Sequence, residues 1–167
     1  MPVKIVFEEN HIEVELAVKK ANELLSMDDF YNRIKQKESF DLSTATPQQV
    51  SDIINSSSLL FAVEFFYPNF LNFKYRKTFA YTDGRFPNRL FLNYKKLNRS
   101  IESIAATIIH EAIHAVDDAE QVYTFGHGNN SPVGKQNTAP YWIGNLALTM
   151  LLNSDSPTTI MFDVEEE

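Results

Sequence analysis

Two histidines and a glutamate in the stretch His110-Glu111-Ala112-Ile113-His114 have the types and the spacing that metal chemistry needs. Side chains four residues apart lie one helical turn apart on the same face of a helix. A neutral imidazole nitrogen is a good Zn²⁺ ligand, and a zinc ion that activates water needs three protein ligands and one open position. A carboxylate beside the first histidine is suited to accept the proton of that water. The stretch therefore predicts two zinc ligands, His110 and His114, and a general base, Glu111.

The segment around this stretch has the periodicity of an amphipathic helix. At about 100° per residue, one stripe collects its apolar residues, namely Ile101, Ile104, Ala105, Ile108, Ala112, Ala115, Val116 and Ala119. His110 and His114 fall on the opposite side, together with Asp117 and Gln121. A histidine of the core would normally lie within or beside the stripe. We therefore expect a helix from Ser100, its N-cap, to about Glu120, with the histidines facing a cleft.

A third ligand has four candidates, which are Asp117, Asp118, Glu120 and His127. Asp117 shares the histidine face, but three ligands from consecutive turns of a straight helix would leave little room for substrate. We expect Asp117 to accept a hydrogen bond from a ligating imidazole instead. Asp118 lies on the side of Glu111, where it either orients that carboxylate through water or is solvated.

His127 is the favoured third ligand. It stands between two glycines, Gly126 and Gly128, which let the backbone turn sharply and approach a metal closely. The chain between His114 and His127 is long enough to leave the helix and fold back. Asp117 remains the alternative ligand.

The helix with His-Glu-Ala-Ile-His-Ala, the strands before it and the later Gly-His-Gly resemble the minimal zincin metalloproteases, with the layout of SprT-like proteases. The specific part of the resemblance covers Leu92 to Gly128. It implies a zincin-like fold, Zn²⁺ as cofactor, and His127 as the ligand that completes the site. It also implies that an edge strand before the motif helix, here Arg89 to Tyr94, pairs with an extended peptide substrate. SprT-like proteases often carry a cysteine zinc ribbon and act near DNA, whereas this chain has no cysteine.

Strand signals occur in four places. Val3 to Phe7 and Leu59 to Tyr67 are apolar runs, and Glu64 within the second is expected to face outward. Residues 73–82 alternate aromatic and polar side chains, and a turn-rich loop joins them to 89–95. We expect 73–82 and 89–95 to form an antiparallel hairpin. The order of elements predicts a single α+β domain over 1–167, with a small, mostly antiparallel sheet packed against the motif helix and flanking helices.

Helical signals occur on both sides of these strands. Apolar positions at helical spacing predict a helix over 12–25, and Ser26 with Asp29 resembles a capping box for a second helix to about Lys35. Thr46, followed by proline and two glutamines, predicts a capped helix over 47–55. A last helix is expected from about 140 to 153, and the acidic end, 163–167, is expected to fray.

The composition of the chain limits the kinds of partner and chemistry that we expect. The net charge is −7 with no basic stripe, so nucleic acid is not an expected partner. Cysteine is absent, which removes disulfides, zinc ribbons and thiol catalysis together. No signal peptide and no transmembrane run is recognised, so we expect a cytoplasmic protein with no membrane partner. Export by a dedicated secretion system is also compatible with this sequence.

These patterns together predict a zinc metallopeptidase that acts on a peptide or protein. Besides the metal, the oxyanion of the reaction needs a donor, for which Tyr123 and Tyr141 are candidates, and Asn93 is a candidate for contact with substrate. Two alternatives stay open: a non-catalytic interaction module with a structural or vestigial zinc site, and an exported, toxin-like metallopeptidase. The sequence also leaves the substrate and the oligomeric state open.

Overall fold

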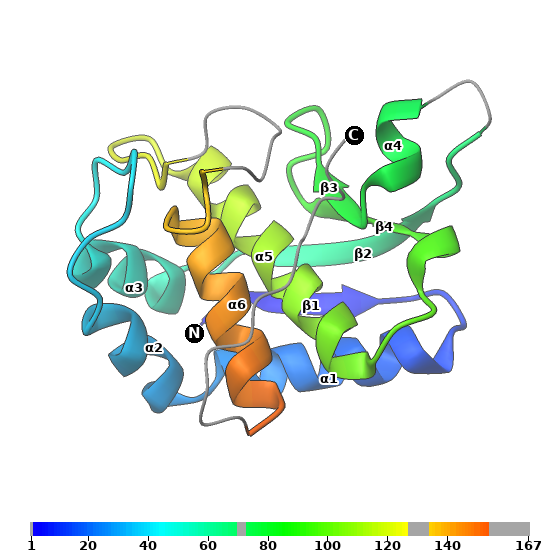
Figure 1. Cartoon of the computed structure of the whole chain (residues 1–167), viewed down its shortest axis with the longest axis horizontal. Helices are drawn as coiled ribbons and strands as arrows, with labels where there is room; N and C mark the ends of the chain where they lie inside the picture. The colour runs from blue at the N-terminus through cyan, green and yellow to red at the C-terminus, as the bar shows by residue number, and fades with distance from the viewer. Residues whose placement is uncertain (1, 70–72, 127–133, 154–167) are drawn as a thin grey trace.

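The computed structural model of the chain describes residues 2–69, 73–126 and 134–153. In chain order, and as Figure 1 shows, its elements are β1 (Lys4–Phe7), α1 (Ile12–Leu25), α2 (Asp28–Lys35), α3 (Pro47–Ser56), β2 (Leu60–Phe66), α4 (Phe73–Lys77), β3 (Ala80–Thr82), β4 (Arg89–Asn93), η1 (Tyr94–Lys96), α5 (Ile101–Ala119) and α6 (Ala139–Leu151). The acidic end, 163–167, lies outside the described residues. None of the helices within them has the length and apolar character needed to cross a bilayer.

The four described strands form one sheet in the order β1-β2-β4-β3. The α+β class predicted from the sequence is confirmed, but the expectation of a mostly antiparallel sheet is wrong. β1 pairs with β2 in parallel, β2 pairs with β4 in parallel, and only β3 with β4 is antiparallel. The reason is that α1, α2 and α3 lie between β1 and β2, and such a crossover returns the chain to run in the same direction.

The strand expected to bind substrate at an edge, Arg89 to Tyr94, is an interior strand. β4 pairs with β2 along one side and with β3 along the other, so its backbone is not open to a peptide. The edge strands are β1 and β3. The outer side of β1 is occupied at Ile5, where the backbone N–H donates to Asn22 Oδ1 (3.0 Å) and the carbonyl accepts from Asn22 Nδ2 (2.8 Å).

The predicted strand over 73–82 is only partly a strand. Its last residues form β3 and pair with β4 as a hairpin, but residues 73–77 form the short helix α4. Asn93 accounts for the difference, because its Nδ2 donates to the carbonyls of Tyr75 (3.2 Å) and Thr78 (2.8 Å). These carbonyls therefore need no strand neighbour. The rings of Tyr75 and Tyr81 also pack together, with centroids 4.7 Å apart.

The other predicted elements agree with the structure in position. α3 begins with the predicted capping box, in which Thr46 Oγ1 accepts from the Gln49 N–H and Gln49 Oε1 accepts from the Thr46 N–H. Glu64 does face outward, where it pairs with Arg89 at 3.0 Å. The capping box expected at Ser26 is wrong. Ser26 ends α1, its hydroxyl donates to the Glu23 carbonyl, and α2 begins after Met27 without a side-chain cap.

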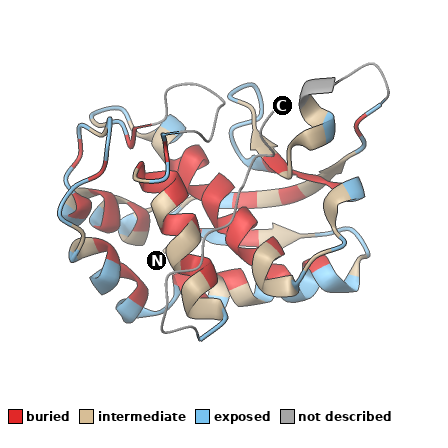
Figure 2. Cartoon of the chain, viewed as in Figure 1, coloured by how far each residue is buried: buried red, intermediate tan, exposed pale blue. Residues whose placement is uncertain are grey.

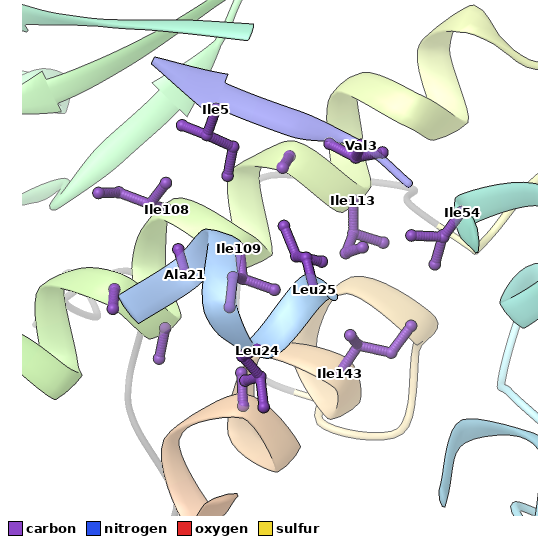
Figure 3. Packing of buried hydrophobic residues seen from close by; sticks show 14 of the residues in the cluster. Val3, Ile5, Ala21, Leu24, Leu25, Ile54, Ile108, Ile109, Ile113 and Ile143 are labelled. Atoms are coloured by element: carbon purple, nitrogen blue, oxygen red, sulfur yellow. The ribbon is translucent and has the colours of Figure 1, made fainter. Parts of the chain in front are cut away.

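α5 is the central helix and is buried on nearly all sides. It packs against α1, α6, β3 and β4, and every residue from Ile104 to Val116 is buried. Figure 2 shows this continuous burial along α5. Figure 3 shows its isoleucines, Ile108, Ile109 and Ile113, among side chains of α1, α6 and β1. Burial of each such side chain contributes about 1.5–3 kcal/mol.

The predicted two-sided helix is therefore wrong in one respect. The apolar stripe faces the core as expected, but the histidine side is also covered rather than open. The reason is that α6 packs alongside α5, and its first turn brings Pro140 and Tyr141 to the histidines. Burial of the two imidazoles costs free energy unless their nitrogen atoms are hydrogen-bonded or bind a ligand.

Candidate metal centre

The two imidazoles of α5 converge. His110 Nε2 and His114 Nε2 lie 3.0 Å apart, and the ring planes are nearly perpendicular at 87°. The exposed fractions are 2% for His110, 5% for Glu111 and 7% for His114, so the whole motif is shielded from bulk water. The helix accounts for the convergence, since side chains four residues apart meet on one face.

The Nδ1 atom of His110 lies 3.0 Å from the carbonyl oxygen of Pro140, at the start of α6. A carbonyl oxygen only accepts, so Nδ1 must donate. A neutral His110 then has its lone pair on Nε2, the atom that faces His114. A backbone carbonyl in this position is the usual second partner of a metal-ligating histidine, because it sets the tautomer and the ring orientation.

The distance between the two Nε2 atoms fits a shared metal ion. Zn–N bonds of 2.0–2.1 Å in a tetrahedral site place two ligand nitrogens about 3.3–3.4 Å apart. The observed 3.0 Å is close to this value and requires only small ring rotations. The same distance also fits an N–H···N hydrogen bond from His114 to His110. The chemistry of the pair therefore suits zinc, and measurement of bound metal separates the two interpretations.

Within the described residues, no group of three His, Asp or Glu side chains could hold one ion. His110 and His114 form a pair, and neither Asp117 nor Glu120 joins them in such a group. The predicted third ligand, His127, lies outside the described residues. The structure therefore brings two of the three predicted ligands together and does not test the third.

Asp117 serves a backbone group in the structure. Its Oδ1 accepts a hydrogen bond of 2.8 Å from the N–H of Phe125, the residue two positions before His127. Burial raises the pKa of Asp117 to about 6, although the Phe125 N–H opposes this shift. Asp118, on the next position, is exposed. The predicted bond from Asp117 to an imidazole stays a prediction.

The two ends of segment 127–133 are held by the loop before α3. On one side, Thr44 N–H donates to the Thr124 carbonyl (3.0 Å), and Thr124 N–H donates to Thr44 Oγ1 (2.8 Å). On the other side, Asp41 N–H donates to the Asn137 carbonyl (3.1 Å), and Asn137 Nδ2 donates to Asp41 Oδ1 (2.8 Å). The loop thus fixes where the chain leaves for His127 and where it returns.

Gly126 stands at the first of these ends and cannot carry a side chain without strain. Its φ is +94°, a region that favours glycine. A Cβ added there would collide with the carbonyl oxygen of Asp41. Gly126 therefore allows the chain to pass close to the backbone of Asp41, and the predicted close approach to a metal stays a prediction.

The candidate oxyanion donors differ in position. The Tyr141 ring lies 4.7 Å from the His110 ring and 6.4 Å from the His114 ring, centroid to centroid. Tyr123 is engaged with α3, where its hydroxyl accepts from Gln49 Nε2 at 2.8 Å. Asn93 is fully buried and bonds the backbone of Tyr75, Thr78 and Lys95. These contacts place the Tyr141 ring beside the histidines and give Tyr123 and Asn93 structural roles, and the predicted donor role of Tyr141 stays a prediction.

Sequence reasoning missed two contributors, the Pro140 carbonyl and the loop that contains Asp41 and Thr44. Neither had a signal that could have been used. Every residue carries a carbonyl, and a polar loop far from the motif shows nothing of the partner that it will contact. Comparisons with protein-family models, with curated proteins and with solved structures gave no match for this chain.

Proposed function

We propose that this chain is a zinc-dependent metallopeptidase with its centre on α5. The observation that carries the proposal is the convergence of two buried imidazole nitrogens, one with its tautomer set by the Pro140 carbonyl, beside a buried carboxyl group. Burial of two imidazoles and a carboxylate lowers the stability of the fold, so packing alone does not explain why these groups are buried. Their cost is explained if they bind an ion and move a proton.

His110, His114 and His127 would hold the zinc. When bound, zinc supplies Lewis-acid chemistry, in which it lowers the pKa of water and polarises the scissile carbonyl. Glu111 accepts the proton of the attacking water and delivers it to the leaving amine. Glu111 is buried, which keeps its carboxyl away from bulk water. Tyr141, packed on His110, is the candidate donor to the oxyanion.

The substrate would be an extended peptide. β3 is the edge strand that packs against α5, whereas the outer side of β1 is occupied by Asn22. An extended peptide can add to such an edge through backbone hydrogen bonds. β3 thus replaces the interior strand β4 in the proposal.

The test is cleavage of a mixed peptide library, with products identified by mass spectrometry. Wild-type protein should cleave, and Glu111→Gln protein should cleave at least about 10²–10⁴-fold more slowly, because glutamine keeps the shape but cannot accept the proton. The variant should retain its metal content and melting temperature, since all three histidines remain. Equal cleavage by the two proteins would refute the role of Glu111. No cleavage by metal-loaded wild-type protein would refute the peptidase proposal.

A further inference from the structure

A half-buried arginine, Arg99, lies on the same side of α5 as the two histidines and has no part in the proposed mechanism. Arg99 precedes α5, and its Nη1 donates to the Thr107 hydroxyl oxygen at 2.6 Å. A spacing of four, three and four residues places a row of polar side chains on one face of α5, namely Ser103, Thr107, His110 and His114. Thr107 precedes His110 by three residues, or about 4.5 Å along the helix axis.

The guanidinium of Arg99 is held rigidly. Nε donates to the Lys96 carbonyl (3.1 Å), and Nη1 also reaches the carbonyl (3.3 Å) and the hydroxyl (3.2 Å) of Ser103. Its Cζ lies 4.4 Å from the centre of the Phe79 ring, one residue before β3. These contacts fix the plane of the guanidinium at the N-terminal end of α5, next to the edge strand β3.

One nitrogen of this group is unused. Nη2 is shielded from solvent and has no hydrogen-bond acceptor within the described chain. No Asp or Glu of the described chain forms an ion pair with Arg99 either, and burial lowers its pKa to about 10. An arginine that only tied the loop to α5 would not need the two further N–H groups of Nη2 in a shielded site. A buried donor without an acceptor is costly and calls for a partner.

We propose that Arg99 is a specificity-determining residue that binds a carboxylate of the substrate through Nη2. This inference rests on the proposed peptidase function. An extended residue spans about 3.3–3.6 Å, so the carboxylate would lie within about two or three residues of the bond over His110 and His114. A rigid guanidinium is matched to a planar carboxylate. We take this carboxylate to be the C-terminus of a short peptide, and the test below compares it with a side-chain carboxylate.

Binding of three probes to Glu111→Gln protein tests this inference without hydrolysis. The probes are N-acetyl-alanyl-alanine, its C-terminal amide, and N-acetyl-glutamyl-alanine amide, and the readout is the dissociation constant from NMR titration. The free acid should bind at least about tenfold more tightly than the alanyl amide, which corresponds to about 1.4 kcal/mol. Preference for the glutamyl amide over the free acid would assign the carboxylate to a substrate side chain instead.

Two substitutions complete the test. Arg99→Gln should remove the preference for the acid, and Arg99→Lys should restore only part of it, because lysine keeps the charge without the planar fork. Arg85→Gln is the matched control, since Arg85 is exposed and pairs with Asp83. If Arg99→Gln does not fold, the comparison of probes on the parent protein still decides.

Equal affinity for acid and amide probes, or no binding of any probe up to millimolar concentration, would overturn the inference. Zinc content is measured on the same preparations, and cleavage of long peptides without a nearby C-terminus is measured on protein that retains Glu111, with and without the Arg99→Gln substitution. Cleavage that persists in the absence of any carboxylate preference would refute the role of Arg99 and leave the peptidase proposal standing.

Discussion

The two parts of the candidate centre are held by different forces. His110, Glu111 and His114 lie on a helix that is buried from Ile104 to Val116, so core packing places them. The stems at 124–126 and 134–138 are held by hydrogen bonds to the loop 41–46 and to Asp117. Packing over a whole helix is cooperative, whereas each bond between loops contributes only about 0.5–1.5 kcal/mol. Substitutions in the helix and substitutions in the stems should therefore have effects of different size on zinc binding and stability.

Loss of a helix ligand should have the largest effect. His114→Ala removes one of the two converging nitrogens, so zinc affinity should fall by orders of magnitude. His11→Ala is the matched control, because His11 lies at the start of α1 beside Glu13, with its ring against Phe65. Competition with a chromophoric chelator measures both. If His114→Ala leaves the zinc affinity unchanged, the histidine pair of α5 is not the zinc site.

His127→Ala tests whether the second region delivers a ligand at all. If His127 is the third ligand, its loss should also weaken zinc binding by orders of magnitude. Asp117→Ala should weaken it only about 10–100-fold, as changes in supporting partners do, because it frees the Phe125 N–H at the stem. The opposite ranking in the same competition assay would make Asp117 the ligand.

Gly126→Ala should damage the second region alone. A residue with a side chain in the left-handed region costs about 1–2 kcal/mol, and the collision with the Asp41 carbonyl adds to this cost. Urea denaturation should show the loss, together with weaker zinc binding. Gly84→Ala is the control, since a Cβ there meets nothing within 4 Å, and its stability should stay within about 0.5 kcal/mol of wild type. Equal stability of the two variants would contradict the described stem.

Asp117 should give a smaller, pH-dependent effect in EDTA-treated protein. Burial raises its pKa in the folded state to about 6 from the ordinary value of 3.8, so between these values the folded state binds more protons than the unfolded state. Stability from this group is therefore lost as pH rises from about 4 to about 6. Asp117→Asn should remove that contribution, so the difference in unfolding free energy between variant and wild type should shift in favour of the variant as pH rises. A difference that is flat with pH would contradict the burial of Asp117.

The motif helix could be predicted because its signals are local. Spacing placed His110 and His114 on one face, and Ser100 is the cap as expected, with its side chain accepting from the Ser103 N–H. In α1, the predicted apolar positions are the buried ones. These elements depend on periodicity and capping, which neighbouring residues determine.

The predictions that were wrong concern features that depend on contacts between residues far apart in the sequence. Whether β1 and β2 run in parallel is decided by the crossover between them, and the helical start at 73–77 depends on Asn93. The cover over the histidines comes from α6, thirty residues along the chain at Pro140. Alternation or a stripe in one segment contains no information about such partners, which is why the open cleft and the edge strand were mispredicted.

Zinc content is the most direct test of the central claim, that the imidazole pair of α5 is part of a metal site. Protein purified without an affinity tag should contain close to one zinc per chain by elemental analysis, and treatment with EDTA should remove it reversibly. His114→Ala protein, prepared in the same way, should contain none. Wild-type protein that contains no zinc and takes up none at neutral pH would show that the 3.0 Å contact is only a hydrogen bond between two buried histidines.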